Sequence, residues 1–177
     1  MTQQSSDLIA FLRTLRAVRE YTPEPVAEDV IRDILEVGRW TGTASNRQHA
    51  EIVVVRDKAV LQQMTENGVR AAAGAALALV TVAAGNPDYR DLEIFDEGRV
   101  VERLLLAARA HGLGANIGTL KGEGPNLIKQ ALGIPAERRA WSVVTIGHID
   151  REARRARPQN PNAGRRPLEE FAHWDRY

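Results

Sequence analysis

The sequence predicts an α+β fold in which helices dominate and cover one mostly buried sheet. Three observations support this prediction. Apolar runs of strand length are few and widely separated, segments with helical periodicity lie between them, and no repeat or linker divides the 177 residues. We therefore expect a single domain over residues 1–177, long enough to bury a core of its own.

The N-terminal part of the chain contains two expected helices separated by a break. Apolar residues recur at helical spacing from Leu8 to Leu15, with Asp7 near the start of this first helix. Two prolines within residues 22–25 follow, and proline continues neither a helix nor a central strand. A second amphipathic helix is expected over about residues 27–40.

The first two strands are expected at residues 52–55 and 75–83. The earlier one is a short β-branched run, and a helix over 58–66 that ends at Asn67 and Gly68 follows it. The later one is apolar throughout, although its many alanines leave a helix open as an alternative.

The clearest helix spans residues 94–111, with an apolar stripe beside charged residues and Gly112 as its expected C-terminal stop. A glycine-rich loop is then expected. A helix over about 125–132 and a strand over 141–147 complete the ordered elements. The arginine-rich run 151–157 is interpreted as a solvated surface.

Composition excludes several classes of function. The chain has no cysteine, which excludes a disulfide framework, a thiolate metal site and a cysteine nucleophile. Its net charge of +1 indicates neither a nucleic-acid partner nor a membrane partner. The N-terminus lacks the pattern of a signal peptide, and the longest apolar run, residues 71–85, is shorter than the ~20 residues of a membrane helix. A soluble, cytoplasmic protein is therefore expected.

Motifs for metal, nucleotide and hydrolase chemistry are weak. The histidines lack metal-ligand spacing, so no metal is expected. GLGANIG (112–118) follows a helix instead of a strand, and its last two glycines are too far apart for a dinucleotide fingerprint. Neither Ser45 nor Ser142 has the glycine frame of a nucleophile elbow.

The stretch TGTASNRQHA, which we name the connector (residues 41–50), joins the second helix to the first strand. It combines small residues with a run of hydrogen-bonding side chains, although a helix-to-strand connection needs only a few polar residues. Capping and turn formation explain part of this composition.

Four blocks, taken together and in order, resemble the nitroreductase family of flavin mononucleotide (FMN) enzymes. The resemblance implies a nitroreductase-like fold with a central, mostly antiparallel sheet covered by helices, in an intertwined homodimer with two FMN sites at the interface. The blocks are LRAVREYTPEPV (15–26), RWTGTASNRQ (39–48), FDEG with LLLAARAHGLGANIG (95–118), and GRRPLEEF (164–171).

The resemblance assigns arginines to the anionic parts of FMN. Arg16 and Arg165 match the positions that bind the phosphate, with Arg166 as a neighbour, and an arginine fork suits a phosphate dianion. Arg19 matches the cation beside the pyrimidine edge of the flavin, where it would stabilise the anion of the reduced ring. We refer to residues 16–19 as the arginine segment.

Other positions match parts of the family that approach the flavin with small side chains or backbone. Ala17 stands at a serine position and offers only backbone. Ile117 and Gly118 match the segment near the flavin N5 atom, where an N–H group can bond the nitrogen that accepts hydride. The connector residues that match the segment reaching the flavin from the partner subunit are Gly42, Thr43, Ala44 and Asn46.

The chain departs from the family pattern at three places. Leu15 stands where the family usually has its first arginine, and Ala163 stands where a lysine often lies in the tail. His49 and Ala50 replace the usual Pro-Trp pair after Gln48.

The resemblance implies an oxidoreductase that passes a hydride from NADH or NADPH through FMN to a small oxidised acceptor, such as a nitroaromatic, a quinone or an enone. No catalytic side chain is assigned, because the flavin carries the redox chemistry. Two alternatives stay open. One is a flavin-binding protein that stores, senses or degrades the cofactor, and the other is a cofactor-free interaction protein that retains the fold.

Structural explanations exist for many of the same residues. Arg16 and Arg19 taken alone are typical of solvated arginines at a helix end. Gly112 and Gly114 are interpreted as a helix stop and a tight strand entry. The tryptophans, expected to pack in the core or at an interface, are Trp40, Trp141 and Trp174.

Overall fold

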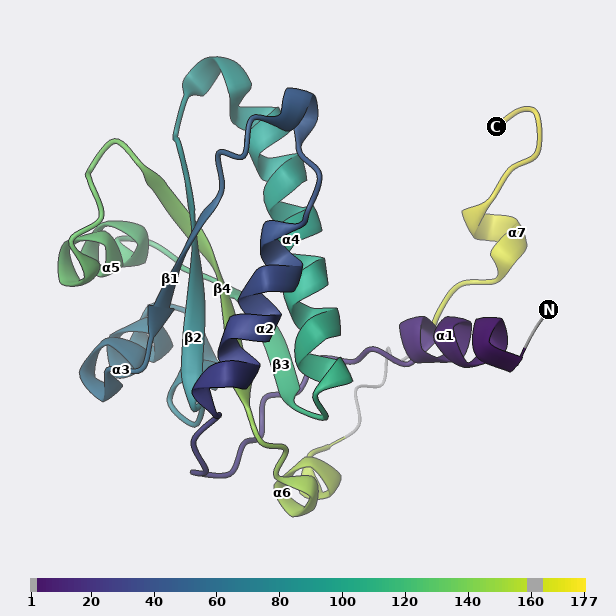
Figure 1. Cartoon of the computed structure of the whole chain (residues 1–177), viewed down its shortest axis with the longest axis horizontal. Helices are drawn as coiled ribbons and strands as arrows, with labels where there is room; N and C mark the ends of the chain where they lie inside the picture. Colours follow the sequence, from purple (N-terminus) through teal and green to yellow (C-terminus); the bar gives the residue numbers. More distant parts are fainter. Residues whose placement is uncertain (1–2, 159–163) are drawn as a thin grey trace.

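The centre of the molecule is a four-stranded sheet in the order β1-β2-β4-β3 (Figure 1). The computed structural model describes residues 3–158 and 164–177. All three strand pairings are antiparallel, which confirms the mostly antiparallel sheet. The strands are Glu51–Val55 (β1), Leu77–Ala83 (β2), Gly114–Thr119 (β3) and Arg139–Gly147 (β4).

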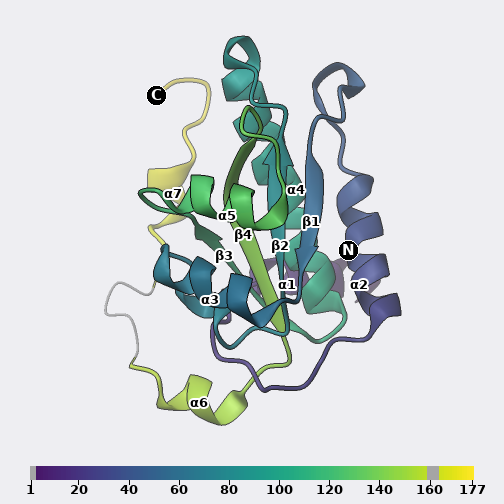
Figure 2. The same cartoon turned by 90° about the vertical axis from the view of Figure 1, so that its left-hand side faces the viewer.

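Helices cover both faces of this sheet. The long helix α4 packs with α2 on one face, and α3 and α5 lie on the other, as Figures 1 and 2 show from two sides. Three short 3-10 turns, η1 (Ala44–Asn46), η2 (Arg70–Ala72) and η3 (Pro87–Tyr89), connect the main elements. The helices are Gln3–Arg13 (α1), Glu28–Arg39 (α2), Lys58–Glu66 (α3), Arg90–Ala110 (α4), Gly124–Leu132 (α5), Arg151–Ala156 (α6) and Leu168–Phe171 (α7).

Two hydrophobic cores result from this layering. On the α2 and α4 face, Ile34, Leu104 and Ile146 are almost completely buried. On the α3 and α5 face, Leu61 and Ile128 are buried to the same degree. Every residue of β2 is buried, so this run is a central strand and its helical alternative is wrong.

The strand β3 was expected only as a strand entry at Gly114 and otherwise as a glycine-rich loop, because its glycines favour a loop. Gly114 and Gly118 lie inside β3. Glycine is needed at both positions because other segments of the same chain pass where a side chain would stand. A Cβ at Gly114 would lie 2.6 Å from Val18 Cγ1, and one at Gly118 would lie 2.9 Å from Val69 Cγ1. The expected glycine-rich loop is therefore wrong over residues 114–119, whereas the tight approach at Gly114 is confirmed.

The long helix α4 begins earlier than expected and ends where expected. Asn86 and Pro87 start η3, which leads directly into α4, because proline is tolerated at a first helical position. At the other end Gly112 has φ +74°. The Leu113 N–H donates to Ala108 O at 2.9 Å and the Gly112 N–H to Arg109 O at 2.9 Å, which completes a Schellman motif.

The two ends of the described chain project from the sheet and its helices (Figure 1). None of the residues in α1 or α7 is buried, although Leu8, Leu12 and Phe171 are large and apolar. Arg109 of α4 holds the end of α1, because its Nη2 donates to Thr14 Oγ1 at 2.6 Å. Both projecting segments therefore present apolar side chains to solvent in the isolated chain.

The three tryptophans are exposed in this chain, with fractional exposures of 69% for Trp40, 43% for Trp141 and 87% for Trp174. The prediction that they pack in the core of the same subunit is therefore wrong. Among the described residues, no helix combines the length and the apolar content that a membrane span requires.

Candidate functional site

The arginine segment lies at the free edge of β3. The Val18 N–H donates to Ala115 O at 2.8 Å, and the Val18 side chain is buried against Gly114. This one backbone bond brings Ala17 and Arg19, the neighbours of Val18, to the strand edge. The structure therefore brings the arginine segment and β3 together, as a shared binding site requires.

Tyr21 links the arginine segment to β4. Its hydroxyl group donates to Val18 O at 2.6 Å and lies 2.9 Å from Thr145 Oγ1 of β4. Burial raises the pKa of Tyr21 to about 12, so the hydroxyl stays protonated at neutral pH and can donate. Gly147 admits the Tyr21 ring, because a Cβ there would lie 3.0 Å from the ring carbons.

Ile117 offers both an apolar side chain and a backbone donor at the same edge. Ala115 O points away from β4, toward Val18, and groups two residues apart on a strand point the same way. The N–H of Ile117 is therefore directed outward, away from the β3–β4 ladder. Its side chain is 43% exposed on the sheet, and the neighbouring Asn116 Oδ1 is buried without a hydrogen-bond partner among the described residues.

The two arginines of this segment differ in their contacts. Arg16 Nη1 donates to Arg13 O at 2.8 Å and to Leu15 O at 2.7 Å, so one of its nitrogens closes the end of α1. The Arg19 guanidinium is exposed and makes no hydrogen bond or ion pair with the part of the chain that the structure describes. Both side chains leave donors available to an anion.

The connector is not brought to this edge within one chain. Figures 1 and 2 place it beyond the C-terminal end of α2, whereas the arginine segment lies near the opposite end of the sheet. Gly42, Thr43, Ala44 and Asn46 are therefore distant from Arg16, Arg19 and Ile117 in the same subunit. A site that uses both regions needs two subunits.

The predicted tail arginines also stay apart from the strand edge. Arg165 Nη1 donates to the adjacent Gly164 O at 2.7 Å, and the Arg166 guanidinium lies 5.3 Å from the centre of the Phe171 ring. Neither contacts the arginine segment of this subunit. The departure at Ala163 lies outside the described residues.

The backbone of the connector is strained. Ser45, Asn46 and Gln48 have φ values of +50°, +52° and +48°, in the left-handed region that favours glycine. Each such residue costs roughly 1–3 kcal/mol, with asparagine at the low end. Within the connector, the Gln48 N–H donates to Thr43 Oγ1 at 3.0 Å, which stabilises the turn from inside.

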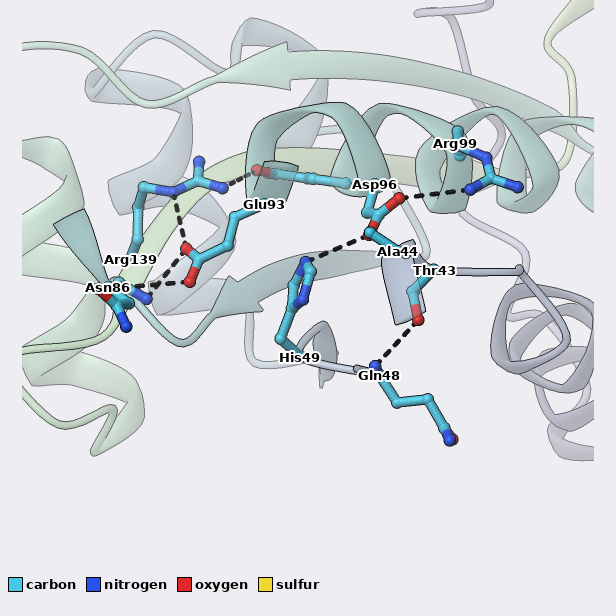
Figure 3. Close-up of polar contacts among 11 residues, drawn as sticks. Thr43, Ala44, Gln48, His49, Asn86, Glu93, Asp96, Arg99 and Arg139 are labelled. Carbon is cyan, nitrogen blue, oxygen red and sulfur yellow. Dashed lines mark hydrogen bonds and ion pairs between the residues drawn. The ribbon is translucent and has the colours of Figure 1, made fainter. Parts of the chain in front are cut away.

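A buried carboxylate holds the connector from outside (Figure 3). Asp96 of α4 is 1% exposed, and its Oδ2 accepts the Ala44 N–H at 3.0 Å. Arg99 Nη1 lies 3.3 Å from the other oxygen of Asp96. His49 Nε2 lies 3.7 Å from Oδ2, too far for a hydrogen bond, and its side chain is 10% exposed. The histidine that replaces the family's proline is thus turned inward.

Two more buried carboxylates of α4 contact residues that follow β2 and residues at the start of β4. Glu93 accepts the N–H groups of Gly85 at 3.1 Å and Asn86 at 3.2 Å. Glu97 Oε2 lies 2.5 Å from Arg139 Nη2, in an ion pair that is largely buried. Sequence reasoning missed these carboxylates. A signal existed, since residues 93, 96 and 97 continue the helical stripe of Val100 and Leu104.

One pocket has a volume of about 610 Å³. It lies between the start of α4, α5 and the start of β4, and a smaller one of about 290 Å³ lies under the connector, beside Thr43 and Gln48. The larger pocket is lined mainly by Arg90, Ile94, Pro125, Lys129, Arg139 and Trp141.

The edge of the antiparallel sheet at β3 thus combines an outward N–H, an exposed apolar residue and nearby arginines. Comparison with known proteins shows what the chain as a whole is similar to. The model of the nitroreductase family matches residues 12–90. A protein of Archaeoglobus fulgidus, whose name suggests an NADH dehydrogenase or NAD(P)H nitroreductase, is 27% identical over 148 residues, 80% of this chain and 85% of its own length.

Solved structures extend the likeness over nearly the whole chain. An FMN-dependent nitroreductase of Clostridium difficile superimposes with a TM-score of 0.78 at 22% identity, over 96% of this chain and 99% of its own. A Desulfovibrio desulfuricans protein, described as a nitroreductase in complex with FMN, gives 0.76 at 26% identity, over 96% and 97%. Residues 12–90 thus match the nitroreductase family, and the chain has the nitroreductase fold.

Proposed function

We propose that this protein is an FMN-dependent oxidoreductase that transfers a hydride from NADH or NADPH, through the flavin, to a small oxidised acceptor such as a nitroaromatic, a quinone or an enone. The names of the relatives support this proposal, since one is called FMN-dependent and another was solved with FMN. The A. fulgidus relative is named for NADH and NAD(P)H.

The observation that carries the proposal is the outward N–H of Ile117 beside the arginine segment. A flavin needs a donor near N5, a flat apolar surface for its ring and cations for its anionic parts. Ile117 supplies the first two, because its N–H points away from the ladder and its side chain is exposed. Arg16 and Arg19 supply cations with free donors within a few residues of the strand edge.

Each residue then has one task when the cofactor is bound. Arg16 would hold the phosphate, Arg165 and Arg166 would add charge to the same region, and Ala17 would offer only its backbone. Arg19 would stabilise the anionic reduced ring and raise its reduction potential. Ile117 and Gly118 would present the strand backbone to the ring. The bound flavin supplies the hydride chemistry, so no side chain of this chain needs to act as acid or base.

The active form in this proposal is a homodimer of two whole domains, each over residues 1–177, with two sites at the interface. Two observations support the dimer. The connector and the arginine segment are far apart in one chain, and the projecting segments α1 and α7 expose apolar side chains that a partner would bury. The partner's connector residues Gly42, Thr43, Ala44 and Asn46 would complete each site.

An absorbance spectrum of the freshly purified protein tests the proposal first, combined with light scattering for the oligomeric state. We expect flavin bands, one FMN per subunit, a dimeric mass and turnover of NADH or NADPH with a quinone acceptor. Bound FMN without turnover would indicate a protein that stores, senses or degrades the cofactor. Absence of FMN and no uptake of added FMN would leave only an interaction protein with this fold.

A further inference from the structure

Asp96 stands out because the function proposed above gives it no role. It lies in the second turn of α4, 1% exposed, although an ionised carboxylate is costly to bury without partners. Its carboxylate meets the Ala44 N–H at 3.0 Å and Arg99 at 3.3 Å, and the nearby His49 Nε2 is buried without a hydrogen-bond partner among the described residues. Two of these three groups belong to the connector.

The connector needs an external support of this kind. Ser45, Asn46 and Gln48 have positive φ values, so the turn is unfavourable by itself. The bonds from Asn46 N–H to Thr43 O and from Arg47 N–H to Ala44 O are internal and would move with the turn. The hydrogen bond from Ala44 N–H to Asp96 is different, because it ties the turn to the rigid helix α4 (Figure 3).

A few other contacts restrain the connector less directly. The Arg47 guanidinium lies 3.8 Å from the centre of the exposed Tyr89 ring, and Arg103 Nη1 donates to Trp40 O at 3.0 Å just before the connector. Gly42 passes Arg99, whose Nη2 would lie 3.3 Å from a Cβ there. These contacts involve exposed side chains, whereas Asp96 is buried and charged and therefore sets the position most strongly.

We propose that Asp96 is a positioning residue that fixes the shape of the connector so that its Thr43–Asn46 turn can line the FMN site of the partner subunit. This inference rests on the proposed FMN function. It assigns to a side chain that does not touch the cofactor the task of presenting Gly42, Thr43, Ala44 and Asn46 to it.

The test compares Asp96→Ala and Asp96→Asn with a matched control, Glu97→Gln. Glu97 is also buried and charged, lies next in α4, and contacts Arg139 and Thr81 instead of the connector. Three quantities are measured for each variant: the melting temperature of the apoprotein, the dissociation constant of FMN by fluorescence titration, and hydrogen exchange of the Ala44, Arg47 and Gln48 amides by NMR.

We expect Asp96→Ala to weaken FMN binding about tenfold or more and to speed exchange of the three connector amides by a similar factor. Asp96→Asn should stay within about threefold of the wild type, because its amide oxygen can still accept the Ala44 N–H. Glu97→Gln should lower the melting temperature and leave FMN affinity and connector exchange within about threefold of the wild type.

Either of two results would overturn the inference. Unchanged connector exchange in a folded Asp96→Ala or Asp96→Asn protein that has lost FMN affinity would mean that Asp96 does not act through the connector. Equal losses of FMN affinity in Asp96→Ala and Glu97→Gln would mean that the effect is general destabilisation. A wild type that takes up no FMN refutes the proposed function instead, and the exchange measurement on the apoprotein still decides whether Asp96 holds the connector.

Discussion

The arginine segment and the connector are both surface segments without regular secondary structure along most of their length, yet the fold holds them by different means. The arginine segment docks through a backbone bond from Val18 to β3 and through one buried valine side chain. The connector has no strand to pair with where it turns, and a single buried carboxylate, Asp96, ties it to α4.

The difference determines how each region responds to substitution. Backbone docking depends on space between main chains, so it is sensitive at the glycine that admits Val18 and tolerant at most other side chains. A strained turn held by a carboxylate depends on that one group and on the φ values of its own residues. The predictions below test each half of this comparison.

The largest effect is expected for Gly114→Val. Its Cβ would lie 2.6 Å from Val18 Cγ1, so the arginine segment must move away from β3. We expect a loss of about 3 kcal/mol in the free energy of unfolding, measured by urea denaturation, together with loss of FMN. Adding Val18→Ala should restore part of both. Failure of this second substitution to restore either one would show that the close approach is not the cause.

The next effect concerns the pH dependence set by Tyr21. Its pKa rises from 10.0 to about 12 on folding, so its contribution to stability is fully present below pH 10 and is lost as the pH rises to about 12. The loss amounts to roughly 2.7 kcal/mol. Denaturation curves of wild type and Tyr21→Phe at several pH values isolate this group. Parallel pH profiles of the two proteins above pH 10 would contradict the assignment.

A third prediction concerns Arg16, the arginine assigned to the phosphate of FMN. Arg16→Ala should weaken FMN binding by about 2 kcal/mol, the size of a hydrogen bond to a charged group. The measurement is the FMN content after purification and the dissociation constant on reconstitution. Arg13→Ala replaces an exposed arginine at the C-terminal end of α1; this variant is the control and should keep its FMN. Full occupancy in Arg16→Ala would remove its phosphate role.

The smallest effect tests the strain in the connector. Ser45 is exposed at φ +50°, a conformation that glycine adopts without steric cost. Ser45→Gly should raise the free energy of unfolding by roughly 0.5 kcal/mol, after the entropy of glycine is subtracted. Ser45→Ala keeps the strain and is the comparison, so equal stability of the two variants would show that the turn is not strained at this residue.

Much of the fold was predictable because its signals are local. The helix expected over residues 58–66 has those bounds, and its end at Asn67 follows the prediction. The stop of α4 at Gly112 was predictable because the Schellman motif needs a residue that tolerates positive φ. The strand 75–83 was favoured for its apolar run, and burial on both faces of the sheet explains why that pattern is continuous.

Other features depended on neighbours that no local pattern reveals. β3 contains two glycines that pack against Val18 and Val69, and both partners are distant in sequence. Asp96 and Glu97 continue the buried stripe of α4 with charged side chains, and only the structure shows that Ala44 and Arg139 are their partners. The predicted contacts of the connector with the cofactor stay predictions, because they would join two subunits.

The sequence by itself determined where most helices and strands lie, that the protein resembles an FMN enzyme, and which arginines and small residues match the family's cofactor contacts. Only the tertiary structure decided that the N–H of Ile117 points away from the β3–β4 ladder and that Asp96 accepts a hydrogen bond from the connector. The reason is physical. Helix periodicity and turn chemistry act over a few residues, whereas strand pairing and the burial of a charge depend on groups that folding brings together from distant parts of the chain.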